Sequence, residues 1–153
     1  MKILLAVDGS DCSERAAEMV ASQFPQTSSD IRVLHVDEWP KGLPTELAFA
    51  EGPAAAKAVL VSHERRRLDA EALVSRHAAN LRAAGLRTST VVRLGDAREG
   101  VLESAAEWGA DLIVLGSHGR TGVNRFLLGS VSESVARHAP CSVLIVRTGS
   151  AGA

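Results

Sequence analysis

The sequence predicts a doubly wound α/β fold, a five-stranded parallel sheet in a single domain with helices on both faces. Three observations predict it. Short aliphatic runs alternate with longer helical segments, the pattern of strands joined through crossover helices. These runs are apolar on both faces, as strands covered by helices on both sides must be. The length of 153 residues, 46 % of them hydrophobic, suits one globular domain.

The first three elements follow from local signals. Residues 2–7, which contain the apolar run 3–7, are expected to form a buried strand. Asp11 and Glu14 have capping-box spacing, which predicts a helix that continues to about residue 24. The β-branched and aliphatic residues of 31–36 predict the second strand.

The middle of the chain is expected to hold the longest helix. It follows a segment rich in Pro and Gly and covers residues 54–84, with Gly85 placed to end it. Residues 88–94 predict the third strand. Asp96 and Glu99 repeat the capping-box spacing, so a helix is expected from there to about residue 108.

The last elements surround a glycine-rich loop. Residues 112–115 predict the fourth strand, which ends in glycine. Ser130 and Glu133 again have capping-box spacing, so a helix is expected from Ser130 to about residue 139, ahead of Pro140. Residues 143–146 predict the fifth strand. We expect residues 1–148 to be the domain and residues 149–153 to be a flexible tail.

Composition excludes several function classes. The chain has 17 Lys and Arg against 18 Asp and Glu, so it lacks the positive charge that binding to nucleic acid or an anionic membrane requires. Its apolar runs reach only about five residues, too short for a membrane span or a secretory signal. A cytoplasmic protein is therefore expected. Cys12 and Cys141 have no metal-site spacing and are expected to be free thiols.

The expected strand order places the chemistry at one edge of the sheet. Ligands of open α/β sheets bind at the carboxyl ends of strands, where the strand order reverses. With the order 3-2-1-4-5, that point lies between the first and fourth strands. It brings Asp8-Gly9-Ser10 against the glycine-rich segment 116–130. Asp37-Glu38 and Gly95-Asp96 follow the second and third strands and are also expected near this edge.

The glycine-rich segment is the most specific signal. Glycines let the backbone approach a ligand closely, and the segment leads into a helix whose free N–H groups and dipole favour an anion. Ser130 has two possible roles there, capping the helix and donating its hydroxyl to a phosphate. Without the spacing described next, turn formation alone would explain the glycines.

The spacing resembles the signature of a known family. Gly116-x2-Gly119-x9-Gly129-Ser130 is similar to the motif of universal stress proteins in their ATP-binding branch. The resemblance extends to the segments 7–10, 95–96, 110–114 and 138–146, and so to nearly the whole chain. Ser142 departs from the family pattern, because relatives often have proline there.

The resemblance implies a site for ATP with Mg²⁺ or Mn²⁺. Asp8 would lie near the ribose and phosphates or the metal, Val36 would present backbone groups to adenine, and Gly116 would approach the ribose. The other cofactor-binding residues expected from it, or from their place in the same segments, are Gly9, Ser10, Ser117, His118, Gly119, Arg120, Gly129, Ser130, Val131 and Ser132.

Competing enzyme patterns are incomplete. No lysine follows these glycines as a P-loop would need, and the first strand is followed by only one glycine of a dinucleotide fingerprint. His118 has no second base beside it in sequence, so we expect an exposed loop residue or a neutral phosphate contact. His35 is expected to be a hydrogen-bonded strand residue. Arg65-Arg66-Arg67 is expected to be the solvated face of the long helix.

The sequence therefore predicts an ATP-binding stress-response module whose bound nucleotide changes a surface read by a partner. Two alternatives stay open. One is a slow ATPase acting as a timer, and the other is a dimeric interaction protein with a vestigial pocket. A homodimer is expected through the fifth strand, Val143 to Val146, because that strand lies at an edge of the sheet and the resembled family associates in this way.

Overall fold

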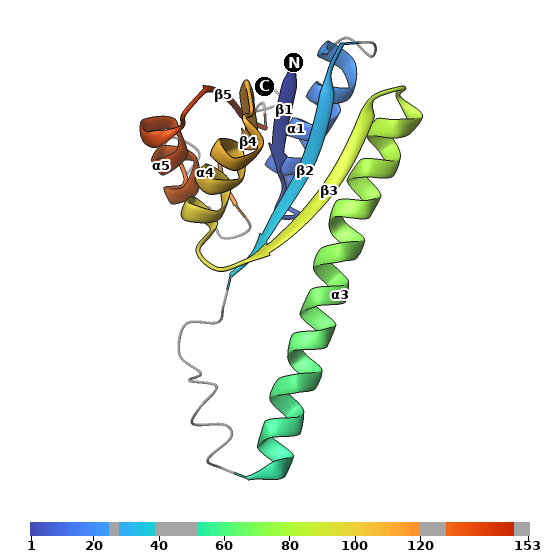
Figure 1. The fold of residues 1–153 in the computed structure, drawn as a ribbon, viewed down its shortest axis with the longest axis vertical. Helices are drawn as coiled ribbons and strands as arrows, with labels where there is room; N and C mark the ends of the chain where they lie inside the picture. Colours follow the sequence, from blue (N-terminus) through green and yellow to red (C-terminus); the bar gives the residue numbers. More distant parts are fainter. Residues whose placement is uncertain (25–27, 39–51, 120–127, 149–153) are drawn as a thin grey trace, which may run out of the picture.

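The computed structural model describes residues 1–24, 28–38, 52–119 and 128–148, and the described part of the chain forms one parallel sheet. Figure 1 shows its strands side by side in the order β3-β2-β1-β4-β5, which confirms the predicted fold and order. The strands are β1 (Lys2–Ala6), β2 (Asp30–Asp37), β3 (Arg87–Leu94), β4 (Leu112–Gly116) and β5 (Ser142–Val146). The predicted tail, residues 149–153, lies outside the described residues.

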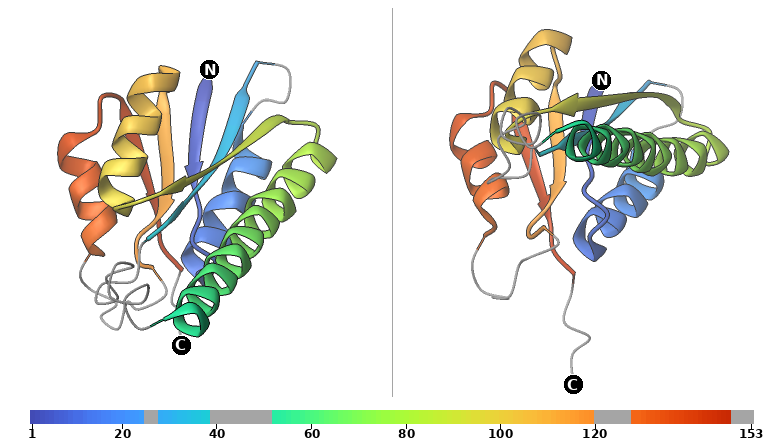
Figure 2. Two further views of the ribbon diagram at one scale, coloured as in Figure 1. Left: turned by 60° about the horizontal axis from the view of Figure 1, so that its bottom comes forward. Right: turned by 90° about the horizontal axis from the view of Figure 1, so that it is seen from below.

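Alternate side chains of the central strand enter two separate cores. Ile3 and Leu5 point to one face of the sheet and Leu4 points to the other, and all three are completely buried. Two pairs of helices cover these faces (Figure 2): α1 (Asp11–Gln23) and α3 (Pro53–Ala83) on the first, α4 (Ala97–Trp108) and α5 (Ser130–His138) on the second. The strands can be apolar on both faces because helices cover both faces of the sheet.

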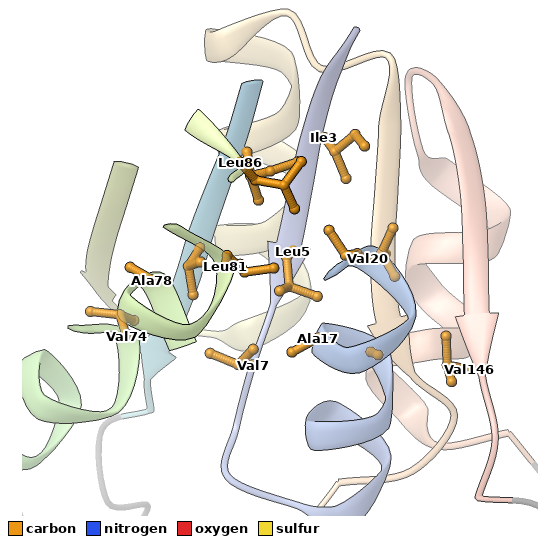
Figure 3. Packing of buried hydrophobic residues seen from close by; sticks show 14 residues of the cluster. Ile3, Leu5, Val7, Ala17, Val20, Val74, Ala78, Leu81, Leu86 and Val146 are labelled. Atoms are coloured by element: carbon orange, nitrogen blue, oxygen red, sulfur yellow. The ribbon is translucent and has the colours of Figure 1, made fainter. Parts of the chain in front are cut away.

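The first core joins α1 and α3 to the sheet. Figure 3 shows Val20 of α1 and Leu81 of α3 turned toward Leu5 of β1. Each of these side chains is at most 1 % exposed. Burial of a side chain of this size contributes about 1.5–3 kcal/mol, so this cluster is a main source of the stability of the domain.

Two predicted helix boundaries are confirmed by their hydrogen bonds. Asp96 caps α4 by accepting from the N–H groups of Arg98 and Glu99. A side-chain hydrogen bond from Arg98, together with these N–H groups, holds the pKa of Asp96 far below its usual range. Gly85, with φ of +86°, ends α3 in a Schellman motif in which Gly85 and Leu86 donate back to the last turn.

Two other predicted helix starts are shifted by one residue. Ser10, not Asp11, is the N-cap of α1, with extended backbone and a hydroxyl that accepts from Ser13 N. Gly129, not Ser130, occupies the cap position of α5. Ser130 is the first helical residue, so its hydroxyl is not used as a cap. Asp11 instead lies in the first turn of α1, where its charge favours the helix dipole.

Helix α3 is buried only along its second half. Its 31 residues give a length of about 46 Å. All of its buried residues lie between Ala70 and Leu81, and Figure 1 shows the first half running beyond the edge of the sheet. No helix in the described ranges is long and apolar enough to cross a membrane.

His77 is a buried titratable group at the contact between α3 and α1. Its side chain is 1 % exposed, and its Nε2 lies 3.5 Å from Glu14 Oε1. Burial lowers the pKa of His77 from its ordinary value of 6.5, and the charge of Arg76 lowers it further, whereas Glu14 acts to raise it. The folded state therefore favours the neutral imidazole.

We predict a loss of stability on mild acidification that depends on His77. The folded state lowers this pKa, so the unfolded chain binds the proton more tightly. The stability contributed by neutral His77 is complete above about pH 6.5 and falls as the pH drops below that value. In urea unfolding at stepped pH, the free energy of unfolding of the wild type should fall more steeply from about pH 7 to 5 than that of His77→Leu.

The control is His138→Leu, which removes an exposed histidine from α5. It should keep the steeper wild-type dependence. Parallel curves for the wild type and His77→Leu would show that His77 does not cause the loss.

Candidate functional site

A cleft lies at the carboxyl ends of β1, β2 and β4, where the strand order reverses. Its volume of about 880 Å³ is within the range of small-molecule sites. Residues from the first turns of α4 and α5 also line this cleft. The lining residues are Ala6, Val7, Asp8, Ser13, Leu34, His35, Val36, Asp37, Glu38, Arg66, Ala97, Val101, Leu115, Gly116, His118, Gly119, Gly129, Ser130, Val131 and Ser132.

The structure brings most of the predicted site residues into this cleft. Nine of them line it: Asp8, Val36, Gly116, His118, Gly119, Gly129, Ser130, Val131 and Ser132. Gly9, Ser10 and Ser117 lie next to lining residues without lining the cleft themselves. Arg120 lies outside the described residues. Sequence reasoning thus found the glycine-rich side of the cleft.

Asp8 connects the first strand to the glycine-rich segment. Its Oδ1 accepts hydrogen bonds from Ser10 N at 3.0 Å and Ser10 Oγ at 2.6 Å. Its Oδ2 faces Gly119 so closely that a Cβ added to this glycine would lie 2.8 Å from the oxygen. Ser10 Oγ also lies within hydrogen-bond distance of the His118 carbonyl, at 3.3 Å. The Asp8 turn and the glycine-rich segment therefore lie in direct contact.

Gly116 is required by packing. A Cβ at this position would lie 2.6 Å from Cys12 Cβ and 2.9 Å from the carbonyl carbon of the same residue. Such distances are far below van der Waals contact, so any larger residue would push α1 away from the end of β4. This contact explains the glycine without a ligand.

The start of α5 is held in place by the carbonyl of Ser117. Gly129 N donates to it at 2.8 Å, and Ser132 Oγ donates to it at 2.9 Å. Helix geometry leaves the N–H groups of the first turn, from Ser130 to Ser132, without partners inside the helix. Because these residues line the cleft, the positive end of α5 is directed toward it.

Of the two roles expected for His118, the exposed loop residue is wrong, and the neutral phosphate contact stays a prediction. His118 is half-buried, and its Nδ1 lies 3.0 Å from Ser117 Oγ. Its Nε2 is buried and has no hydrogen-bond partner among the described residues. His35 is half-buried as expected, and its Nδ1 donates to the Val7 carbonyl at 2.7 Å. Both histidines are among the residues that line the cleft.

The opposite end of the cleft is mainly apolar, with a charged rim. Leu34, Val36 and Val101 line its floor. Gly100 of α4 packs directly against Val36, because a Cβ added to this glycine would lie 2.8 Å from Val36 Cγ2. This contact holds the Val36 side chain in position. This end therefore offers an apolar surface to a ligand.

The sequence placed Asp37 and Glu38 near this edge as expected, but it did not indicate Arg66, which completes a charged rim with them. Arg66 was expected on the solvated face of α3, but it lines the cleft and forms an ion pair with Asp37. Its neighbours Arg65 and Arg67 do lie on the exposed face, paired with acidic residues of α3. The position of Asp37 after a strand was the available signal, whereas nothing local indicates its partner.

Cys12 is a buried thiol behind Gly116. Burial acts to raise its pKa, but hydrogen bonds with Thr148, Ser117 and His118 outweigh that effect and lower the pKa below its ordinary value. Both cysteines are free, and neither lines the cleft. We therefore assign them no part in this site.

This geometry defines the class of protein, an open doubly wound α/β domain with a glycine-walled cleft at its switch point. Residues 1–147 match the Universal stress protein family (Usp), and the chain belongs to that family. Universal stress protein YxiE of Bacillus subtilis is 31 % identical over 148 residues, which cover 95 % of this chain and 98 % of that protein. A universal stress protein of Thermus aquaticus is 34 % identical over 145 residues, 95 % of this chain and 97 % of the relative.

Solved structures share the fold over nearly the whole chain. The structure of the protein MJ0577 matches with a TM-score of 0.80 and 25 % identity, over 98 % of this chain and 97 % of that one. A universal stress protein in complex with cAMP matches with a TM-score of 0.60 and 25 % identity, over 97 % and 98 %. One from Archaeoglobus fulgidus in complex with dAMP matches with a TM-score of 0.66 and 21 % identity, over 95 % and 97 %.

Proposed function

We propose that this chain binds an adenine nucleotide, ATP with a divalent cation, and acts as a nucleotide-dependent module in a stress response. The observation that carries the proposal is the direction of the α5 N-terminus into a cleft whose other end is apolar. A helix start favours phosphate, and an apolar pocket favours a base. A solved relative that holds cAMP supports adenine as the base.

The phosphates would lie at the start of α5. Gly119 and Gly129 have no side chains, so a phosphate can approach their backbone closely. The N–H groups of the first turn of α5 are available as donors to it. Ser130 is exposed, and because it does not cap the helix, its hydroxyl can donate to a phosphate oxygen. The Ser132 hydroxyl lies 2.9 Å from the carbonyls of both Ser117 and Gly129, so its one proton is already used and its backbone N–H is the group available to the ligand.

The charge of the cleft supports a cation bound together with the phosphates. The described lining residues include three carboxylates, Asp8, Asp37 and Glu38, against the single guanidinium of Arg66. A triphosphate beside Asp8 would be repelled unless a cation lies between them. No cluster of three or more metal-ligating side chains occurs in the described residues. The nucleotide would therefore supply most ligands of Mg²⁺ or Mn²⁺, with Asp8 as the protein carboxylate.

We predict that Ser130→Ala weakens ATP binding by roughly ten- to a hundredfold, because a hydrogen bond to a charged group is worth about 1.5–3 kcal/mol. Calorimetric titration of ATP with Mg²⁺ measures the change. Ser134→Ala is the matched control, since Ser134 lies one turn further along α5 and does not line the cleft.

The control should bind ATP as the wild type does, and replacing Mg²⁺ with EDTA should weaken binding to the wild type. Equal affinity of Ser130→Ala and Ser134→Ala would remove Ser130 from the site. Failure of the folded wild type to bind ATP would refute the proposed function.

We further propose that two copies pair through β5. This strand lies at the edge of the sheet, and Val143, Leu144 and Ile145 are only half-buried. The Val146 carbonyl accepts from Ser117 N and so points toward β4. Because backbone groups alternate in direction along a strand, those of Val143 and Ile145 point to the open edge. A two-fold axis would pair two such edges antiparallel.

We predict that Ile145→Pro prevents this pairing, since proline removes an edge N–H without breaking the ladder to β4. Ile145→Ala is the control, because it shortens the side chain and keeps the N–H. Light scattering at micromolar concentration should show a dimer for the wild type and Ile145→Ala and a monomer for Ile145→Pro. A wild-type monomer, or a proline variant as dimeric as the alanine control, would contradict the proposal.

A further inference from the structure

Arg66 reaches from α3 to the end of β2, where three hydrogen bonds hold its guanidinium. Its Nε donates to Asp37 Oδ1 at 3.2 Å, and its Nη2 donates to the same oxygen and to the Glu38 carbonyl. The Arg66 side chain is 32 % exposed and that of Asp37 is 19 % exposed. The Arg66 side chain, which has many rotatable bonds, is thus held in one position beside the cleft.

The orientation of these bonds decides what the guanidinium can offer a ligand. Hydrogen-bond acceptors of an arginine lie in the plane of its fork. Asp37 and Glu38 therefore occupy all three N–H donors of Nε and Nη2, while the two faces of the guanidinium and Nη1 make none of the hydrogen bonds found among the described residues. A planar face suits an aromatic ring, on which arginine stacks more readily than lysine.

The position of Arg66 separates it from the phosphate end. Its partner Asp37 ends β2, whereas the glycine-rich segment follows β4, and β1 lies between these two strands. Two strand spacings amount to roughly 10 Å. The Asp37 carboxylate and the nearby Glu38 carboxylate also make this end unfavourable for a phosphate. A base that fits the apolar floor beside Val36 would lie next to Arg66.

We infer that the Arg66 guanidinium stacks on the nucleobase, and that Asp37 is the residue that positions it. This inference rests on the proposed nucleotide site and assigns that site a base-binding residue outside the glycine motif. Arg66 contributes through its planar face, so its effect on affinity is the same whatever the number of phosphates.

We predict that Arg66→Ala raises the Kd about tenfold, and by the same factor for adenosine, AMP and ATP. Titration calorimetry at low and high salt measures all three ligands. The factor should not change with salt, because a stacked base carries no charge. Arg66→Lys should lose affinity as well, since an ammonium keeps the charge without the plane.

Arg67→Ala is the matched control. It removes the next arginine of α3, which pairs with Glu64 and Glu71 on the exposed face and does not line the cleft. It should bind all three ligands as the wild type does. Asp37→Asn should weaken binding in the wild type and have no further effect in Arg66→Ala, the result expected of a residue that acts through Arg66.

The outcomes are distinguishable. A loss in Arg66→Ala that grows from adenosine to ATP and shrinks at high salt would make Arg66 a phosphate ligand and overturn the inference. Wild-type affinity in a folded Arg66→Ala protein would also overturn it. If Arg66→Ala does not fold, undiminished binding by folded Arg66→Lys overturns it equally. A wild type that binds none of the three ligands refutes the proposed function itself, whereas the results above refute only the role of Arg66.

Discussion

The contact between the end of β4 and the first turn of α1 is the constraint on which the cleft depends. Gly116 lies so close to Cys12 that no Cβ fits between them. This approach sets α1 against the sheet edge, and the Asp8 turn that precedes α1 then meets the segment that follows β4. At Gly119 an added Cβ would meet only Asp8 Oδ2, the end of a flexible side chain. Gly116 is therefore needed to build the cleft, whatever ligand the cleft takes.

The charges around the cleft divide it into two ends with different chemistry. The start of α5 directs unpaired N–H groups into it, which favours an anion. The end of β2 combines an apolar floor with carboxylates and one immobilised arginine. An extended ligand with a phosphate at one end and a flat ring at the other fits this division. An anion alone would leave the apolar end unused, and a small apolar ligand would leave the helix donors unpaired.

The succession of strands and helices and the glycine side of the cleft could be predicted because their signals are local. Alternating apolar runs define a crossover fold, and Asp96 and Gly85 mark the ends of their helices as expected. The start of α1 was misplaced because Ser10 and Asp11 are both good caps, and the sequence does not show which backbone is extended. Arg66 was missed because its contact with Asp37 spans 29 positions and depends on how α3 crosses the sheet.

The most direct test of the account is to identify what the chain carries when it is purified rapidly without added nucleotide. Mass spectrometry of an extract from the native protein should then find an adenine nucleotide, released when the protein is denatured. The account predicts that the emptied protein binds ATP again in the presence of Mg²⁺. A folded protein that carries no nucleotide and takes up neither ATP nor AMP would contradict it.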